Sequence, residues 1–295
     1  MGQARKNEPY SGYMRTLPEL ILCSVALAGA AVPLSSEKII SGSIKDELAF
    51  VYEAPRGKMV LKSWKDGETK WEVPQVAFPS DIKFLGNQAA FVNVRNGTLE
   101  FFFHSLESGV LERYFKYENA GYFMAKIIDS NFAFVIGVKS ITLAKLGTRL
   151  TPLATYEYSS NIVPFSGAET VGESARILVA MGKRGLKLLE VEGYRVRPKP
   201  KLLPESDEQL FEGNAFLDDS FLLGPDKVFW LNVGKDESIL SSWEFLKKGL
   251  SIKEVHRIKG PGKLFGLNGE DVAIVMDTTK NIEFVYGAAK ASGAD

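Results

Sequence analysis

Short apolar runs separated by tight turns repeat along most of the chain. One apolar run at 89–94 leads into the turn Asn96-Gly97, and two further runs follow at 98–103 and 110–115. Asn-Gly supplies the positive φ angles that a two-residue hairpin turn requires. The pattern therefore predicts three antiparallel strands joined by short turns.

The same succession of three strands and two turns recurs with a nearly constant period. Its first strand begins near residues 47, 89, 132, 176, 221 and 271, so the successive spacings are 42, 43, 44, 45 and 50 residues. A period in the forties with hairpin turns inside each unit is typical of propeller blades. A leading strand before each group of three strands would bring every unit to four strands. The expected leading strands cover 38–43, 81–85, 123–128, 169–173, 211–217 and 263–267.

Two units have strand assignments that matter below. In the fourth unit we expect the last strand at 194–197. In the fifth unit we expect 221–223 to be the second strand, behind the leading strand.

The last unit ends one strand short, because 287–295 reads as a polar, small-residue tail. An apolar segment at 20–34 precedes the first leading strand and has no place in the repeat. An open sheet edge leaves a row of backbone N–H and C=O groups unpaired. We therefore predict that 20–28 is the fourth strand of the last blade and closes the ring.

This repeat resembles the β-propeller superfamily over residues 20–286, without matching one of its named families. The Gly-His and Trp-Asp signatures of WD40 repeats and the kelch double glycine are missing. The resemblance implies an all-β chain, with a single propeller of about six four-stranded blades and seven as the alternative. The expected division is an N-terminal arm at 1–18, the propeller at 19–287 and a flexible tail at 288–295.

Composition limits the class of protein. The chain has 295 residues, enough to bury a large core without disulfides or a structural metal. Cys23 is its only cysteine, which excludes a disulfide-built secreted module. Thirty-six basic residues balance 36 acidic ones, so any nucleic-acid surface would have to be a local patch. Many Lys, Glu and Val with few Gln and His indicate a thermophile.

Two interpretations of the N-terminal apolar run stay open. Basic residues precede it, and the small residues at 26–31 are typical of a signal-peptide cleavage site. However, Glu8 lies within the basic region, and Pro18 and Glu19 interrupt the approach, which favours a strand. The run is also too short for a comfortable transmembrane helix. We predict a cytoplasmic protein that does not enter a membrane, with export as the alternative if 1–31 acts as a signal peptide.

Catalytic and metal-binding motifs are weak. His104 and His256 are the only histidines, and neither stands in a metal-ligand spacing. The chain has no GxSxG nucleophile motif, and Cys23 lies in an apolar run as a packed residue. The sequence therefore predicts no catalytic residue, no metal and no cofactor, and it leans against an enzyme.

Charge distribution supplies the binding residues that we expect. The segments 183–201 and 247–263 are basic, and acidic residues lie between them. Because equivalent loops of a propeller share a rim, the basic segments would form a patch if they lie on the same rim, and facing opposite rims is the alternative. Tyr194 and Trp243 would add stacking surface. The residues expected to bind are Lys183, Arg184, Arg195, Arg197, Lys199, Lys201 and Trp243.

Three functions follow from this sequence. The leading one is a non-enzymatic scaffold that presents propeller rim loops to a protein partner, by analogy with the fold. The first alternative is a propeller hydrolase or lyase with a carboxylate-lined central channel. The second alternative is polyanion or nucleic-acid binding through the two basic segments. The identity of the partner and the oligomeric state do not follow from the sequence.

Overall fold

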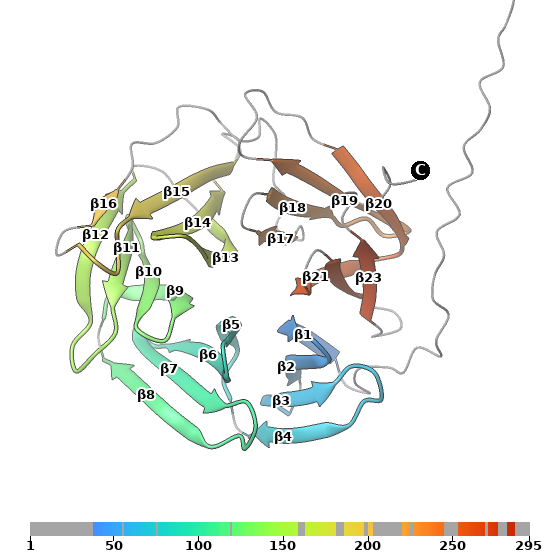
Figure 1. The fold of residues 1–295 in the computed structure, drawn as a ribbon, viewed down its shortest axis with the longest axis horizontal. Helices are drawn as coiled ribbons and strands as arrows, with labels where there is room; N and C mark the ends of the chain where they lie inside the picture. The colour runs from blue at the N-terminus through green and yellow to red at the C-terminus, as the bar shows by residue number, and fades with distance from the viewer. Residues whose placement is uncertain are drawn as a thin grey trace, which may run out of the picture. The chain divides into compact units, whose positions relative to one another are not determined.

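The computed structural model in Figure 1 divides the chain into two units, Met1–Ala30 and Ala31–Asp295. Every residue that the structure describes belongs to the second unit. The described residues are 38–286 without 55, 75, 119, 159–162, 181–185, 198–199, 203–219, 225–226, 245–252, 269–270 and 277–281.

The described residues form six antiparallel sheets, five with four strands and one with three. Sheet one is β1 (Lys38–Lys45), β2 (Leu48–Ala54), β3 (Lys58–Ser63) and β4 (Thr69–Val73). Sheet two is β5 (Pro79–Leu85), β6 (Gln88–Arg95), β7 (Thr98–Ser105) and β8 (Leu111–Tyr117). Sheet three is β9 (Tyr122–Asp129), β10 (Phe132–Gly137), β11 (Ser140–Lys145) and β12 (Thr151–Glu157).

The other three sheets follow in chain order. Sheet four is β13 (Val163–Val171), β14 (Ser174–Ala180), β15 (Leu186–Glu192) and β16 (Lys201–Leu202). Sheet five is β17 (Ser220–Leu223), β18 (Lys227–Asn232), β19 (Glu237–Glu244) and β20 (Lys253–Lys259). Sheet six is β21 (Gly262–Asn268), β22 (Asp271–Met276) and β23 (Ile282–Tyr286).

The first strands of the six sheets meet around a common centre (Figure 1). β1 contacts β5, β5 contacts β9, β9 contacts β13, β13 contacts β17 and β17 contacts β21. β21 in turn contacts β1, which completes the ring. The prediction of an all-β chain with a single propeller of four-stranded blades is confirmed.

The hairpin turn that marks the repeat has the expected backbone. Arg95 pairs with Thr98, so only Asn96 and Gly97 lie between the two strands. Their φ angles are 50° and 74°, both in the left-handed region that Asn and Gly tolerate best. The two residues therefore set the register of β6 against β7.

Each sheet buries both of its faces against neighbouring sheets. In β6, Phe91 joins an apolar cluster with residues of the first sheet, such as Phe50. Its neighbour Val92 points the other way and joins a cluster with residues of the third sheet, such as Ile127. Successive side chains of a strand face opposite sides, so this strand is apolar at nearly every position.

The first and last sheets meet at a close backbone approach. The buried ring of Phe265 in β21 lies against Gly42 of β1, where a side chain would collide with it. Ile44 and Val275 belong to the same apolar cluster. Glycine at position 42 therefore lets the two ends of the ring pack together.

The sixth sheet has three described strands, and its last strand is β23. The proposed fourth strand, 20–28, lies outside the described residues, as do the arm 1–18 and the tail 288–295. In the described part of the chain, no helix is both long and apolar enough to cross a bilayer.

Three strand expectations need correction. The expected strand at 194–197 lies mainly in a turn, because the backbone N–H groups of Val196 and Arg197 donate to Gly193 O. The expected leading strand at 169–173 runs past the end of β13 into the turn that follows Val171.

In the fifth unit, 221–223 belongs to the innermost strand β17, and the fourth strand is β20. The expected leading strand 211–217 lies outside the described residues. β20 alternates charged residues with inward ones, such as the buried Ile258, as an outer strand with one solvated face does.

Candidate functional site

The innermost strands run in the same direction around the centre. Lys45 near the end of β1 donates to Gly86 O, directly after β5, over 2.6 Å. Ser80 near the start of β5 contacts Ala125 in the first half of β9. We call the rim where these strands begin the entry rim and the rim where they end the exit rim.

Polar side chains of β5 hold the free edge of β9. Ser80 Oγ donates to Ala125 O over 3.1 Å, and Asp81 Oδ2 accepts the backbone N–H of Ile127 over 2.7 Å. In return, Lys126 Nζ donates to Ser80 O over 2.8 Å. The innermost strand of a blade has an edge without a neighbouring strand, and unpaired backbone groups there cost free energy when buried. These side chains pair such groups and therefore join neighbouring blades.

Asp81 is the buried acid of this joint. Its side chain is 9% exposed and lies 3.6 Å from Lys126 Nζ. Burial raises the pKa of Asp81, and the charge of Lys126 and the hydrogen bond from Ile127 oppose that rise. The hydrogen bond with Ile127 and the ion pair with Lys126 thus give Asp81 a structural role at the joint.

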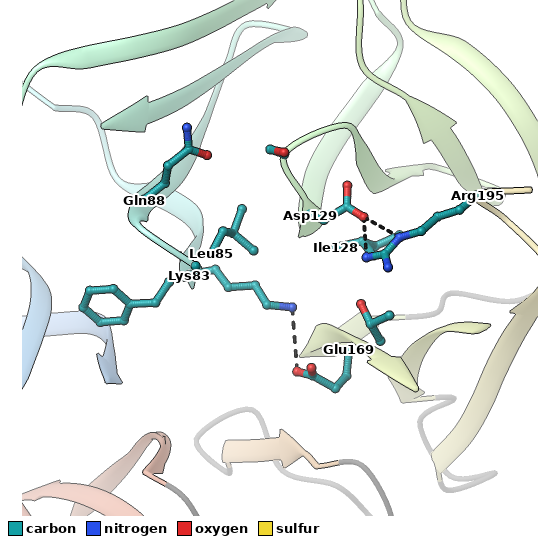
Figure 2. A pocket seen from close by; sticks show the side chains of 11 residues that line it. Lys83, Leu85, Gln88, Ile128, Asp129, Glu169 and Arg195 are labelled. Atoms are coloured by element: carbon teal, nitrogen blue, oxygen red, sulfur yellow. Dashed lines mark hydrogen bonds and ion pairs between the residues drawn. The ribbon is translucent and has the colours of Figure 1, made fainter. Parts of the chain in front are cut away.

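A pocket of about 360 Å³ lies at the exit rim, between the ends of β5, β9 and β13. Figure 2 shows the side chains that surround it, which come from three neighbouring blades and the turn after β15. Lys83 and Glu169 lie on one side, and Asp129 and Arg195 on the other. Leu85 and Ile128 add apolar wall, and Gln88, Ser130 and Thr170 add polar groups.

Arg195 is held in place by Asp129 and Tyr194. Its Nε and Nη2 atoms both donate to Asp129 Oδ2, over 3.1 and 2.8 Å. The guanidinium lies 5.1 Å from the ring of Tyr194, whose hydroxyl also donates to Asp129 Oδ2. The hydrogen bonds to Asp129 raise the pKa of Arg195. Even so, 49% of the Arg195 side chain is exposed, so part of the fixed guanidinium faces solvent.

Lys83 and Glu169 form a looser pair on one side of the pocket. Lys83 Nζ lies 3.7 Å from Glu169 Oε2, beyond hydrogen-bonding distance. The same ammonium donates to Ile127 O over 3.4 Å, which ties it to the β9 edge. Lys83 is therefore tied in part to the edge of β9, and Glu169 keeps acceptor capacity toward the pocket.

Four of the seven residues predicted to bind, Arg195, Arg197, Lys201 and Trp243, lie in the described part of the chain. Lys183, Arg184 and Lys199 lie outside the described residues. Lys201 lies in β16 opposite Glu192, and Trp243 lies in β19 opposite Val228. Of the seven, Arg195 lines the pocket.

Described arginines of the basic segments are paired with acids. Arg197 binds Glu192 over 3.2 Å, next to the turn that carries Arg195. Arg257 binds Glu237 over 2.7 Å and Glu254 over 2.5 Å. These pairs offset part of the positive charge that the sequence suggested for a polyanion surface.

Sequence reasoning missed the other charged residues of the pocket. Lys83 and Glu169 lie in expected leading strands, and Asp129 directly follows another. The available signal was a charged residue inside an innermost strand, where most positions are apolar. Their meeting at one pocket could not be read from the repeat alone.

His104 is a core residue. It is 5% exposed, and its ring stacks near those of Trp71 and Phe91 at centroid distances of 5.7 and 5.9 Å. Nδ1 lies 2.9 Å from Gly109 O, which fixes the tautomer with the proton on Nδ1. Burial lowers the pKa of His104, and the Gly109 carbonyl opposes that shift. Buried Nε2 has no hydrogen-bond partner among the described residues.

Large apolar side chains are exposed on the entry rim. Phe78 directly precedes β5 and is 56% exposed, and Phe123 is the second residue of β9 and is 46% exposed. Val138 follows β10 and is 77% exposed; its neighbour Gly137 pairs with Tyr122 at the start of β9. These three residues, Phe78, Phe123 and Val138, are the entry-rim apolar surface.

Asp81 of β5 and Glu169 of β13 are paired with cations, Asp81 with Lys126 and Glu169 with Lys83. Within the ranges that the structure describes, no three His, Cys, Asp or Glu side chains are grouped to hold a metal ion.

No protein-family model matches the sequence, and a search of curated proteins finds no match. Among solved structures, the β-propeller domain of Cps50 (Swd1) from Myceliophteria thermophila is similar, at TM-score 0.53 and 10% identity over 85% of this chain and 98% of that one. Regucalcin, a calcium-binding protein from Agrobacterium tumefaciens, matches at TM-score 0.54 and 10% identity over 88% and 93%.

Hydrazine synthase from Kuenenia stuttgartiensis matches at TM-score 0.54 and 10% identity over 85% of this chain and 84% of that one. These likenesses show the fold alone.

Proposed function

We propose that this protein is a non-enzymatic scaffold whose entry rim docks a protein partner. The observation that carries the proposal is the entry-rim apolar surface of Phe78, Phe123 and Val138. Large aromatic side chains are enriched among the residues that dominate binding energy at protein interfaces. A single exposed apolar residue is ordinary, but here two phenylalanines lie near the starts of consecutive innermost strands, Phe78 directly before β5 and Phe123 as the second residue of β9.

Phe78 has the features of a preformed anchor. Its ring packs edge-on against Tyr52 at a centroid distance of 5.7 Å, while 56% of the residue stays exposed. Tyr52 is itself held, since its hydroxyl donates to Val76 O. A side chain that is already restrained loses little conformational entropy when a partner covers it.

The two other functions draw less support from the described side chains. For a hydrolase or lyase, the acids Asp81 and Glu169 would have to be released from their lysine partners. For polyanion binding, Arg195, Arg197 and Arg257 would have to exchange acidic partners for phosphate. Steeply salt-dependent binding of a random oligonucleotide would support the polyanion-binding function.

The test compares tagged full-length protein with two variants in affinity purification from the source cells after mild cross-linking. The double variant Phe78→Ser/Phe123→Ser removes the two aromatic anchors of the entry rim. Val196→Ser is the matched control, because Val196 is 64% exposed and lies on the exit rim beside Arg195. Loss of an anchor typically costs ~2 kcal/mol or more, which is about thirtyfold in affinity.

We expect one stoichiometric partner with the wild type and with Val196→Ser, and its loss with the double variant. Melting temperatures should be nearly equal, because exposed substitutions usually change stability by only about ±0.5 kcal/mol. The proposal is wrong if no protein co-purifies in stoichiometric amount, or if the double variant retains the partner as well as the control does.

A further inference from the structure

The exit-rim pocket carries balanced charge. Lys83 and Arg195 supply two cations, and Asp129 and Glu169 supply two acids. A ligand with a single charge would unbalance these groups, and an unpaired charge is costly where water is partly excluded. A zwitterion brings one positive and one negative charge and so preserves the balance.

Arg195 is prepared to receive a carboxylate. Asp129 fixes the guanidinium by hydrogen bonds, and the ring of Tyr194 lies against it. The two hydrogen bonds to Asp129 use only part of the N–H donors of Arg195, and half of the Arg195 side chain is exposed. A planar guanidinium matches a carboxylate with two parallel hydrogen bonds.

Glu169 is prepared to receive an ammonium. Its carboxylate lies too far from Lys83 for a hydrogen bond, and 34% of its side chain is exposed. Figure 2 shows Glu169 across the pocket from Asp129 and Arg195. A ligand ammonium at Glu169 and a ligand carboxylate at Arg195 would therefore be bound by separate blades.

The size and the walls of the pocket narrow the ligand further. A volume of about 360 Å³ lies at the lower end of the ~300–1,000 Å³ typical of ligand sites. Leu85 and Ile128 give an apolar wall for an aliphatic side chain. We propose that the pocket binds a free aliphatic α-amino acid, with its carboxylate on Arg195 and its ammonium on Glu169. This site lies on the rim opposite the proposed partner surface, and either can exist without the other.

The test is calorimetric titration of the full chain with three related compounds. L-leucine carries both charges, L-leucinamide lacks the carboxylate, and N-acetyl-L-leucine lacks the ammonium. We expect L-leucine to bind at least about tenfold more tightly than either analogue, since each loses one charge-assisted hydrogen-bonding group.

Variants assign each ligand group to its residue. Arg195→Gln should abolish the preference for L-leucine over L-leucinamide and keep the preference over N-acetyl-L-leucine. Glu169→Gln should do the reverse. Arg197→Gln is the matched control, because Arg197 follows Arg195 in the same connection, is equally exposed and pairs with Glu192 outside the pocket. It should bind L-leucine as the wild type does.

Several results would overturn the proposal. One is the absence of binding by L-leucine, L-isoleucine, L-valine and L-methionine at about 10 mM, a concentration that detects even millimolar Kd values. Another is equal affinity for the three compounds, or affinity that Arg195→Gln leaves unchanged. If Arg195→Gln fails to fold, Arg195→Lys keeps the charge without the fork and should still weaken L-leucine binding relative to Arg197→Gln.

Discussion

Substitution of Gly42 by alanine should weaken the joint between the first and last blades. An ideal Cβ at this position lies 2.1 Å from Cζ of Phe265 and 2.8 Å from each of its Cε atoms. Those separations are far below van der Waals contact, and Phe265 is 4% exposed in a cluster with Ile44 and Val275. The ring therefore has little room to move away.

Overpacking a filled core costs about 1–3 kcal/mol. For a domain of this size, Tm falls by about 2 °C per kcal/mol, so Gly42→Ala should lower Tm by about 2–6 °C. The assay is equilibrium urea denaturation, with a calorimetric scan as the second measurement. Gly147→Ala is the control, because its added Cβ would meet nothing closer than Arg149 O at 3.7 Å. It should stay within about 0.5 kcal/mol of the wild type.

A second substitution tests the cause of the loss. Phe265→Leu removes Cζ and both Cε atoms, so the collision with a Cβ at position 42 disappears. The double variant should be more stable than the sum of the single effects predicts, by about the 1–3 kcal/mol of the collision. If Gly42→Ala is as stable as the wild type, or if the two effects simply add, β1 and β21 do not pack as described.

Three further predictions concern stability. Because burial lowers the pKa of His104 from its ordinary 6.5, the unfolded chain binds more protons, and the free energy of unfolding should fall as pH drops below about 6.5. His104→Phe should reduce the dependence of the unfolding free energy on pH, measured by urea titrations at several pH values, and an unchanged dependence would contradict the burial argument. Asp81→Ala should lower the free energy of unfolding by about 1–3 kcal/mol because it leaves the Ile127 N–H unpaired, whereas Asp81→Asn keeps an acceptor without the buried charge and should lower it less. Equal losses in urea denaturation would show that the charge, not the hydrogen bond, dominates. Deletion of residues 1–30 should lower Tm sharply or make the protein insoluble if 20–28 closes the last blade, and a stable, folded product would favour the signal-peptide interpretation.

Local turn chemistry made the sheets predictable. Asn96-Gly97 demanded a two-residue hairpin, and the structure places both residues at positive φ. The near-constant period then gave the sheets their order along the chain. The fifth unit was harder, because β20 carries charges on its solvated face and its sequence is typical of a charged surface segment.

The exit-rim pocket depends on contacts between distant parts of the chain. Arg195 and Asp129 are 66 residues apart, and each looks like an ordinary surface charge in its own turn. Tyr194 was expected to add stacking surface, yet it is 1% exposed and packs against Phe132. Strand direction predicts the turns of neighbouring blades that share a rim. The side chains that meet at that rim depend on packing, which the sequence pattern does not reveal.

The most direct test of the scaffold proposal is hydrogen exchange of the purified complex compared with the free protein. Docking on the entry-rim apolar surface predicts slower exchange of backbone amides at and next to Phe78, Phe123 and Val138. Amides in the turns that line the exit-rim pocket should exchange as they do in the free protein. Protection confined to the exit rim or to the outer strands would contradict the proposal.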